Sequence, residues 1–442
     1  MAAIANFSFR KMWRTIAAAL VFALVMVLIV SSCGGGGGGG DNGNSNASSV
    51  PPTPQPVSPI VQPLALPGPY AVACSNIGQD FSRVAAGDDV KTYWEGTLAN
   101  NLTGRYVTNL LADPVNTLSV TVTAPNNTDL YGSYAGRRIP FVILACYPTA
   151  ANNPNPNYPL PTGMAVPHMQ TGNAAPVFSD AAAKYPVILF SHGYSGSPIS
   201  SEYLQIMSTF ASYGYVMLAP FHGDLRFCNL KTNNFAEAAL VLGSFSDVTA
   251  AQALRPLSMT AALDLMLGHP QWRDHLDASQ IGGFGASMGG ETMLLMGGAA
   301  LTTSLGQSST RLAADPRLKA AVGYVPYFGQ PFLPAFGRDQ LGIDGITLPY
   351  LGISGTADTT APIVMAQQGM ARLTGTRELI ALQGVVHAFD VPSTNDIFTW
   401  SLTYFEAMVK GNPVARKQLT TMTSVAGGGD DRVVIPYSGP SQ

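Results

Sequence analysis

The stretch Gln280–Met296, QIGGFGASMGGETMLLM, constrains the fold of this chain more than any other. A short apolar run, 281–284, leads into Gly-Ala-Ser-Met-Gly at 285–289, and residues suited to a helix follow. A serine between a strand and a helix sits on a sharp turn, where glycines avoid the clash that a Cβ atom would cause. Since 46 of 442 residues are glycine, the pentapeptide alone leaves a chance match in a loop open. Ser287 is therefore a candidate nucleophile that needs support from the rest of the chain.

A serine nucleophile needs a base to accept its proton. The chain has six histidines, and only His387 lies downstream of Ser287. It follows the apolar run 378–382, which predicts a strand with the histidine in the loop after it. A histidine in a loop is more often an ordinary polar residue, but the position after the last predicted strand favours His387 as the base.

An acid that orients the base is expected at the end of another strand, after the serine in the chain. Asp358 meets this condition because it follows the apolar run 350–353. Asp344 precedes the same run and so lies at the wrong end of the strand, and Asp390 follows the histidine too closely to approach its ring from behind. We therefore prefer Asp358, with Asp344 and Asp390 as the alternatives.

Two backbone N–H groups are needed to stabilise the negative oxygen that forms when a serine attacks a carbonyl group. One is expected from Met288, the residue after the serine. The other is expected from Tyr194, in the Ser-His-Gly-Tyr loop that follows the apolar run 186–190. Together these amides would form an oxyanion hole.

A metal site would have to combine His192 and His222 with Asp224. These residues lack the spacing with which a helix presents metal ligands on one face. We therefore interpret His192 as a structural residue that shapes its loop, and we expect neither a metal nor a cofactor.

Four further residues are candidates for contact with a substrate: Phe221, His222, Tyr327 and Phe328. The first two follow the predicted strand 216–220. The other two lie in a Pro-, Gly- and Phe-rich stretch, 326–349, which predicts a wall or a lid of a cleft. Because most large apolar residues belong to the core, these four assignments depend on how the chain folds.

From residue 185 onward, apolar runs typical of buried strands alternate with stretches suited to helices. The predicted strands are 186–190, 216–220, 281–284, 320–325, 350–353 and 378–382, and the predicted helices are 201–213, 248–267, 291–296, 363–373 and 396–410. Earlier β-like pieces lie at 70–74, 118–123 and 138–147. Such alternation predicts an α/β fold with a mostly parallel central sheet and helices on both faces.

Residues 1–32 have the pattern of a signal peptide, with basic residues before an uncharged apolar run. Val-Ser-Ser-Cys at 30–33 is similar to the lipobox of bacterial lipoproteins, in which the cysteine, here Cys33, is acylated. A single membrane-spanning anchor is the alternative, because the apolar run is close to the length of a span. We expect an exported protein that is lipid-anchored to the outer membrane or cell surface, or released from it, and that touches the membrane only through the anchor.

A glycine run and Pro-rich sequence predict a flexible tether over 33–68. The folded domain is expected over 69–442, with a β-rich part at 69–184, a catalytic core at 185–411 and a tail at 412–442. The composition of the tether cannot bury a core, so its expected role is to hold the domain away from the bilayer.

The composition limits the partners of the chain. Charged residues make up 11% of the sequence, and 23 Lys and Arg against 26 Asp and Glu give a net charge of −3. No basic block occurs beyond the N-terminus, which argues against nucleic acid as a partner. We expect a monomer that binds no nucleic acid.

Three cysteines remain beside Cys33, namely Cys74, Cys146 and Cys228. An exported protein permits disulfides, and the three cysteines allow three pairings. Cys74 and Cys146 both end predicted strands of the β-rich part, which favours them as the pair and leaves Cys228 free.

From about residue 69 to residue 411 the chain resembles the bacterial α/β-hydrolases grouped with dienelactone hydrolase and platelet-activating-factor acetylhydrolase, and it is similar to polyester-degrading cutinases. The resemblance rests on CYP at 146–148, PVILFSHG at 186–193, APFH at 219–222, RP at 255–256, GASMGG at 285–290, Asp358 with Ala361 and Pro362, and His387. It implies that Ser287 is the nucleophile, His387 the general base and Asp358 the orienting acid. Dienelactone hydrolases proper have a cysteine in place of this serine, so their substrate is not implied.

The resemblance therefore implies the α/β-hydrolase fold and an exported serine hydrolase that cleaves carboxylic esters through an acyl-enzyme, without a cofactor. Its substrates would be short-chain esters, lipids or polyesters. Two alternatives remain open. One is an acyltransferase that uses the same three residues, and the other is a surface lipoprotein whose hydrolase fold serves only binding.

Overall fold

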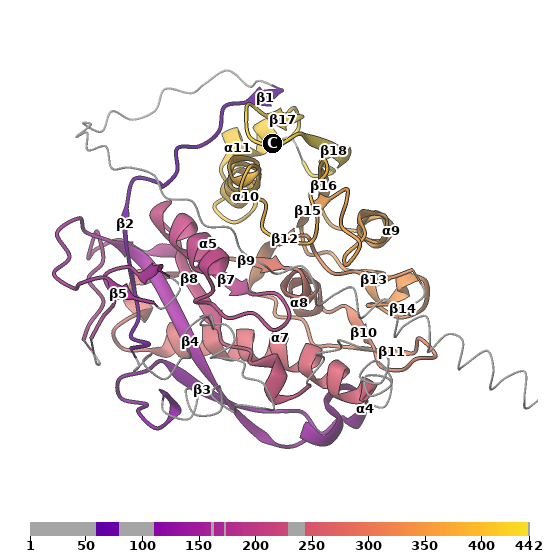
Figure 1. Cartoon of the computed structure of the whole chain (residues 1–442), viewed down its shortest axis with the longest axis horizontal. Coiled ribbons are helices and arrows are strands. Elements are labelled where there is room, and N and C mark those ends of the chain that lie inside the picture. Colours follow the sequence, from indigo (N-terminus) through magenta and orange to yellow (C-terminus); the bar gives the residue numbers. More distant parts are fainter. Residues whose placement is uncertain are drawn as a thin grey trace, which may run out of the picture.

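The computed structural model describes residues 59–78, 110–160, 163–171, 174–228, 244–331 and 333–440 (Figure 1). In these ranges the main sheet has ten strands in the order β18-β16-β15-β12-β9-β7-β8-β4-β2, with β3 paired to β4. The strands are β2 (Ala71–Cys74), β3 (Ser119–Thr123), β4 (Arg138–Thr149), β7 (Tyr185–Ser191), β8 (Val216–Pro220), β9 (Leu276–Ala286), β12 (Leu318–Tyr324), β15 (Tyr350–Gly355), β16 (Arg377–Leu382) and β18 (Asp431–Ile435).

The sheet is parallel at its centre and antiparallel at both edges. Strands β8, β7, β9, β12, β15 and β16 run parallel to one another. At one edge β18 runs antiparallel to β16, and at the other β4 runs antiparallel to β8, β2 and β3. The prediction of a mostly parallel sheet describes the centre only, and the sheet as a whole is mixed. The apolar runs in the sequence indicate which residues form strands. They do not indicate whether a strand at the edge of the sheet runs parallel or antiparallel to its neighbour.

Helices cover both faces of the sheet, and Figure 1 shows them on either side of the row of central strands. The helices α5 (Ser201–Ser212) and α10 (Thr394–Met408) share one face, and α7 (Phe245–Gly268), α8 (Met288–Met296) and α9 (Ile363–Ala371) share the other. Successive side chains of a strand point to opposite faces. Val187 and Leu189 of β7 accordingly lie in the core with α7 and α8, whereas Ile188 and Phe190 lie in the core with α5 and α10.

Residues 59–68 pack on the domain, although the sequence predicted a tether as far as residue 68. The strand β1 (Ile60–Val61) pairs in parallel with β17 (Ser424–Val425). The N–H of Leu64 donates to Oγ1 of Thr399 at 3.1 Å, across 335 positions of the chain. The boundary predicted at residue 69 therefore falls too late, because partners so distant in sequence are invisible to composition.

The predicted signal peptide, Cys33 and the tether as far as residue 58 lie outside the described residues. Within the described ranges no helix is long and apolar enough to cross a membrane. The lipid anchor therefore stays a prediction.

The predicted tail at 412–442 is part of the fold as far as residue 440, where its description ends. The helix α11 (Pro413–Leu419) packs on α10, and β18 extends the sheet beside β16. Nε1 of Trp400 donates to Oδ2 of Asp431 at 2.6 Å, which ties β18 to the helix over it. The prediction of a tail is wrong for these residues, because they form a helix and an edge strand of the domain. Without β18, the edge of the sheet at β16 would be open.

Cys74 and Cys146 form a disulfide between neighbouring strands at the other edge of the sheet. The two residues face each other in the antiparallel pair of β2 and β4, with Cα atoms 4.1 Å apart. Among the described cysteines Cys228 is the free one, and it is buried. The structure thus joins the two cysteines that end predicted strands.

The stretch 326–349, which the sequence predicted as a wall or a lid, contains β13 (Gly329–Gln330), β14 (Leu333–Pro334) and the 3-10 helix η5 (Arg338–Ile343). Nε2 of Gln340 donates to the carbonyl of Met365 in α9 at 3.0 Å. Phe328 is fully buried, with its ring edge-on to Phe336 at 5.6 Å. These contacts pack the described part of the stretch against the rest of the domain, and its role beside a cleft stays a prediction.

Candidate active site

Ser287 lies on the turn between β9 and α8. Its backbone has φ 54° and ψ −119°, in a region that residues other than glycine rarely adopt. The N–H of Ser287 donates to the carbonyl of Tyr324 at 2.9 Å, and its carbonyl accepts from the N–H of Tyr327 at 3.0 Å. Strain of this kind costs about 1–3 kcal/mol and persists only where the surroundings impose it. The turn therefore has the backbone of a nucleophile elbow.

The two glycines of the pentapeptide are required by close backbone contacts. A Cβ atom built on Gly285 would lie 2.1 Å from the carbonyl oxygen of Gly289. A Cβ atom built on Gly289 would lie 1.8 Å from the carbonyl oxygen of Ser191, at the end of β7. Both distances are far below van der Waals contact, and the atoms that would be met belong to the backbone. The pattern therefore allows the helix α8 to begin against the neighbouring strand.

The structure brings Ser287, His387 and Asp358 into one line of contacts. Oγ of Ser287 lies 2.8 Å from Nε2 of His387, and Nδ1 of His387 lies 2.7 Å from Oδ2 of Asp358. The three residues follow β9, β15 and β16, which are parallel strands of one sheet. Parallel strands end at the same edge, which explains how residues 100 positions apart meet.

The carboxylate of Asp358 is held on both of its oxygens. Oδ1 accepts the N–H of Thr360 at 2.8 Å and the N–H of Ala361 at 2.7 Å, while Oδ2 faces His387. Its side chain is fully shielded from solvent, whereas the side chain of His387 is 14% exposed. A carboxylate held in this way can keep the imidazole ring in one orientation.

The two alternative acids have other partners. Asp344 forms an ion pair with Arg372 at 2.9 Å. Oδ2 of Asp390 accepts the N–H and the hydroxyl of Ser393 at 3.0 and 2.6 Å. Both carboxylates are thus engaged elsewhere, and the geometry favours Asp358.

The loop after β7 lies against the serine. A Cβ atom built on Gly193 would be 3.5 Å from Cβ of Ser287. The N–H of Gly193 donates to the hydroxyl of Tyr203 at 3.1 Å, and the phenol of Tyr194 donates to the carbonyl of Cys228 at 2.9 Å. The Tyr194 side chain is therefore anchored to the segment that carries Cys228, and the Tyr194 backbone directly follows Gly193, which adjoins the serine.

Met288 is the first residue of α8 and directly follows Ser287. The first N–H groups of a helix have no partner within it and carry the positive end of the helix dipole. The N–H groups of Gly290 and Glu291, two and three positions further along, donate to the Ser287 carbonyl at 2.9 and 3.4 Å. The predicted oxyanion donors, Tyr194 and Met288, thus belong to two segments that adjoin the serine.

Of the four predicted substrate contacts, Tyr327 adjoins Ser287 through its backbone and is partly buried. The other three are enclosed by the core: Phe221 is 3% exposed, His222 1% and Phe328 0%. These three present almost no surface to a substrate, which corrects their assignment. Burial of this kind depends on packing between distant segments, which the sequence does not display.

His222 uses both of its ring nitrogens inside the protein. Nε2 lies 2.9 Å from Oγ of Ser191 and Nδ1 lies 3.1 Å from Oγ of Ser258. Burial, helped by the nearby charge of Arg255, holds the pKa of His222 well below its ordinary value. Asp224 is paired with Arg255. Within the described ranges, no group of three or more His, Cys, Asp and Glu side chains is arranged as metal ligands would be.

Two buried residues with ionisable side chains were given no role from the sequence, although Arg255 belongs to the RP motif of the resemblance. Arg255 of α7 is 1% exposed and binds Asp224. Glu291 of α8 is fully buried and accepts from Nε2 of Gln252 on both carboxylate oxygens, at 2.9 and 3.1 Å. Burial raises the pKa of Glu291 to about 8. A charged residue inside the otherwise apolar α8 is the signal that would have pointed to Glu291, whereas α7 also carries Asp247 and Asp264 and gives no such signal for Arg255.

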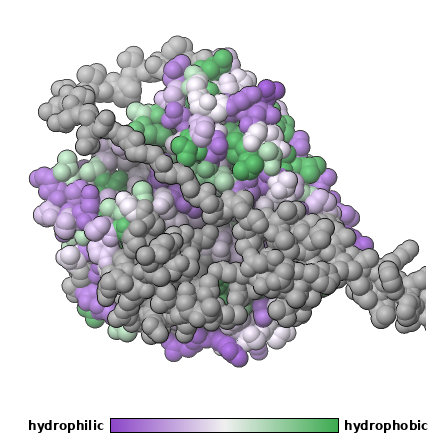
Figure 2. Space-filling model, in the orientation of Figure 1, coloured by the Kyte–Doolittle hydropathy of each residue, from purple (hydrophilic) through white to green (hydrophobic). Residues whose placement is uncertain are grey.

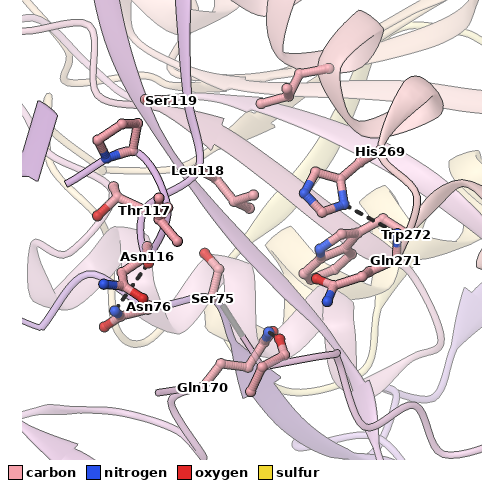
Figure 3. A pocket seen from close by; sticks show the side chains of 14 residues that line it. Ser75, Asn76, Asn116, Thr117, Leu118, Ser119, Gln170, His269, Gln271 and Trp272 are labelled. Atoms are coloured by element: carbon pink, nitrogen blue, oxygen red, sulfur yellow. Dashed lines mark hydrogen bonds between the residues drawn. The ribbon is translucent and has the colours of Figure 1, made fainter. Parts of the chain in front are cut away.

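A separate cavity of about 110 Å³ lies beside β3 and the end of α7 (Figure 3). Its lining includes Ser75, Asn76, Asn116, Gln170, Gln271 and Trp272. The amide of Asn76 donates to the carbonyl of Asn116 at 3.0 Å. None of the predicted site residues lines the cavity.

Comparison with known proteins adds a partial likeness. Residues 168–237 match the family model of platelet-activating factor acetylhydrolase, isoform II. No curated protein matches the chain. The matched segment includes β7, α5, β8 and the loop against Ser287, whereas Ser287, Asp358 and His387 lie beyond it. Over that segment the chain is similar to an α/β-hydrolase family, which supports a hydrolase that acts on esters.

Proposed function

We propose that this protein is a serine esterase that works through an acyl-enzyme. The observation that carries the proposal is the line of contacts from Ser287 through His387 to Asp358, at 2.8 and 2.7 Å. A proton on Nδ1 satisfies the carboxylate and leaves the lone pair of Nε2 facing the serine hydroxyl. A serine needs this arrangement in order to lose its proton as it attacks.

The reaction follows from these contacts. Oγ of Ser287 forms a bond to the ester carbonyl carbon while its proton passes to Nε2 of His387. The amides of Tyr194 and Met288 stabilise the negative oxygen of the tetrahedral intermediate. The carbon–oxygen bond to the alcohol then breaks, and the alcohol leaves with the proton from Nε2. Water attacks the acyl group in the same way, His387 takes its proton, and the serine regains a proton as the acid leaves.

The substrate that fits best is an uncharged acyl ester, such as a short-chain ester, a lipid or a polyester. Val386 and Val391 lie on either side of His387 in the chain and are 51% and 69% exposed. Figure 2 shows apolar residues exposed on the upper part of the face drawn there. Exposed apolar side chains on the segment that carries His387 favour an apolar acyl group over a charged one.

We also propose that the enzyme acts outside the cytoplasm, attached to a bacterial membrane through Cys33. The disulfide between Cys74 and Cys146 supports this location, because such bonds persist in oxidising compartments. The signal-like residues 1–32 would direct the export.

Hydrolysis of p-nitrophenyl butyrate by the purified domain tests the proposed function. The wild type should release p-nitrophenol, and Ser287→Ala should reduce the rate to that of the solution without enzyme. Ser279→Ala is the matched control, since Ser279 is exposed near the start of β9 and its hydroxyl donates to Asp277. Equal rates for wild type and Ser287→Ala, in a folded variant, would rule out the serine mechanism.

A further inference from the structure

The guanidinium of Arg255 lies buried beneath the loop that follows β7. Nε donates to Oδ1 of Asp224 at 2.9 Å, and Nη2 donates to Oδ2 at 2.5 Å. Both side chains are 1% exposed. A buried ion pair is weak evidence for stability, because desolvation of the two charges offsets much of their attraction. The other contacts of this pair therefore matter more than the pair itself.

Nη1 of Arg255 also donates to the hydroxyl of Ser191 at 3.3 Å, and three further contacts of the pair go to the backbone of the loop at 192–195. Nη1 of Arg255 donates to the carbonyl of His192 at 2.5 Å, and Nη2 donates to the carbonyl of Gly193 at 3.0 Å. Oδ2 of Asp224 accepts the N–H of Ser195 at 3.0 Å. The ion pair thus holds two carbonyls and one N–H of four consecutive residues.

The carbonyl of Gly193 is held by three donors. Besides Arg255, these are Nδ1 of His192 at 2.8 Å and the N–H of Gly196 at 3.1 Å. Nε2 of His192 accepts the N–H of His222 at 3.2 Å, so its proton resides on Nδ1 and the ring donates to Gly193. A carbonyl with three donors has a fixed direction.

This direction also orients the next amide. In a trans peptide the C=O and the following N–H point in opposite directions within one plane. The N–H of Tyr194 therefore points away from Arg255. Gly193 itself adjoins the nucleophile, because a Cβ atom built on it would lie 3.5 Å from Cβ of Ser287. The carbonyl that Arg255 holds belongs to the same peptide group as the proposed oxyanion donor.

The loop needs such support because its backbone is strained. Ser195 has φ 54°, a conformation that residues other than glycine rarely adopt. Strain of about 1–3 kcal/mol is expected at such a residue. The bond from its N–H to Asp224 opposes relaxation of the loop.

We infer that Arg255 and Asp224 are positioning residues that hold the Tyr194 N–H in the orientation required of an oxyanion donor. The expected effect of these residues on the reaction rate rests on the proposed function. Their expected effect on the orientation of the Gly193–Tyr194 peptide rests on the loop geometry alone. Preorganised donors account for a large part of catalysis by acyl-transfer enzymes, and loss of one donor lowers kcat by about 100-fold or more.

Three variants test the inference: Arg255→Met, Arg255→Lys and Asp224→Asn. Arg255→Met fills the space without donors, Arg255→Lys restores part of the donor set, and Asp224→Asn removes the charge that fixes the guanidinium. Arg317→Met is the matched control, because it removes another guanidinium paired with an aspartate, Asp315 at 2.7 Å. For each variant we would measure kcat and KM with p-nitrophenyl butyrate, the unfolding temperature, and the crystal structure of the loop.

The inference predicts that Arg255→Met lowers kcat about 100-fold with little change in KM, and that its Gly193–Tyr194 peptide is rotated in the crystal. Arg255→Lys and Asp224→Asn should give smaller losses of the same kind, and Arg317→Met should keep the kcat of the wild type. If Arg255→Met does not fold, the two milder variants decide.

A variant that folds with the kcat of the wild type, or with a lowered kcat but an unmoved peptide, would overturn the inference. A fall in unfolding temperature without a fall in kcat would assign the pair to stability alone. If the wild type hydrolyses no ester, the proposed function fails, and the position of the peptide in the crystals still decides whether Arg255 orients it.

Discussion

Oδ2 of Asp358 lies 2.7 Å from Nδ1 of His387, although the two residues are 29 positions apart in the chain. They meet because each follows one of two neighbouring parallel strands, β15 and β16. The other oxygen of Asp358 accepts two backbone N–H groups, which fixes the carboxylate in its plane. The acid can therefore hold the ring of His387 without moving itself.

Substitution Asp358→Asn should lower kcat by about 10,000-fold with little change in KM. The amide oxygen can still accept from Thr360 and Ala361, but the amide nitrogen cannot accept the proton of Nδ1. The proton then moves to Nε2, where it faces the serine and blocks proton transfer. Steady-state kinetics of both variants, Asp358→Asn and the control Asp344→Asn, would check this. A similar loss in the two variants would contradict the assignment of the acid.

Substitution Gly289→Ala should destabilise the fold by more than about 3 kcal/mol or prevent folding. The added Cβ atom would meet the carbonyl oxygen of Ser191 at 1.8 Å, and backbone cannot rotate out of the way as a side chain can. Gly268→Ala is the control, because a Cβ atom there meets nothing within 4 Å. Chemical denaturation of the two variants measures the difference. If Gly289→Ala and Gly268→Ala had equal free energies of unfolding, the turn at Ser287 would not be packed tightly against Ser191.

The stability of the protein should fall between pH 5 and pH 8 in part because of Glu291. Burial raises its pKa to about 8 in the folded state, whereas a glutamate in an unfolded chain titrates near 4.3. The folded state therefore binds more protons than the unfolded state over this range, and stability decreases as the pH rises. The loss should level off above the folded pKa.

Glu291→Gln should remove this part of the pH dependence, because an amide stays neutral. Relative to the wild type, its free energy of unfolding should gain on the order of 3 kcal/mol between pH 5 and pH 8. Glu202→Gln changes a partly exposed glutamate in the first turn of α5 and serves as the control. If the free energy of unfolding changed with pH in the same way in the wild type and in Glu291→Gln, the raised pKa of the buried Glu291 would be contradicted.

Removal of the disulfide by Cys74→Ala with Cys146→Ala should lower the free energy of unfolding by roughly 4 kcal/mol. The bond closes a loop of 72 residues, and the chain-entropy model gives this value for such a length. Urea denaturation of the oxidised protein and of the double variant measures it. Cys228→Ala alters the buried free cysteine and controls for loss of a thiol from the core. An unchanged midpoint in the double variant would contradict the role of the bond in stability.

Much of the sheet and the meeting of Ser287, His387 and Asp358 were predictable from the sequence. Strands such as β8, at 216–220, are continuous apolar runs because both faces of the sheet are covered, and such runs are easily recognised. Asp358 and His387 follow two such runs, and no other histidine lies after Ser287. Local pattern and order along the chain were sufficient here.

The remaining features depend on contacts between distant residues. β18 exists as a strand because β16 offers it an edge, and residues 59–68 pack because β17 and Thr399 lie there. His222 and Phe328 are large residues after strands, as a pocket residue would be, and only the packed core reveals that they are enclosed. The pairing of Arg255 with Asp224 joins a helix to a loop 31 positions earlier, and nothing local predicts it.

Mass-spectrometric mapping of the site of reaction with a fluorophosphonate tests the central claim most directly, because only an activated serine reacts at a useful rate. The account predicts one adduct per molecule, on the peptide that carries Ser287, and loss of that adduct in His387→Ala. An adduct on a different serine, or equal labelling of Ser287 in the presence and absence of His387, would contradict it.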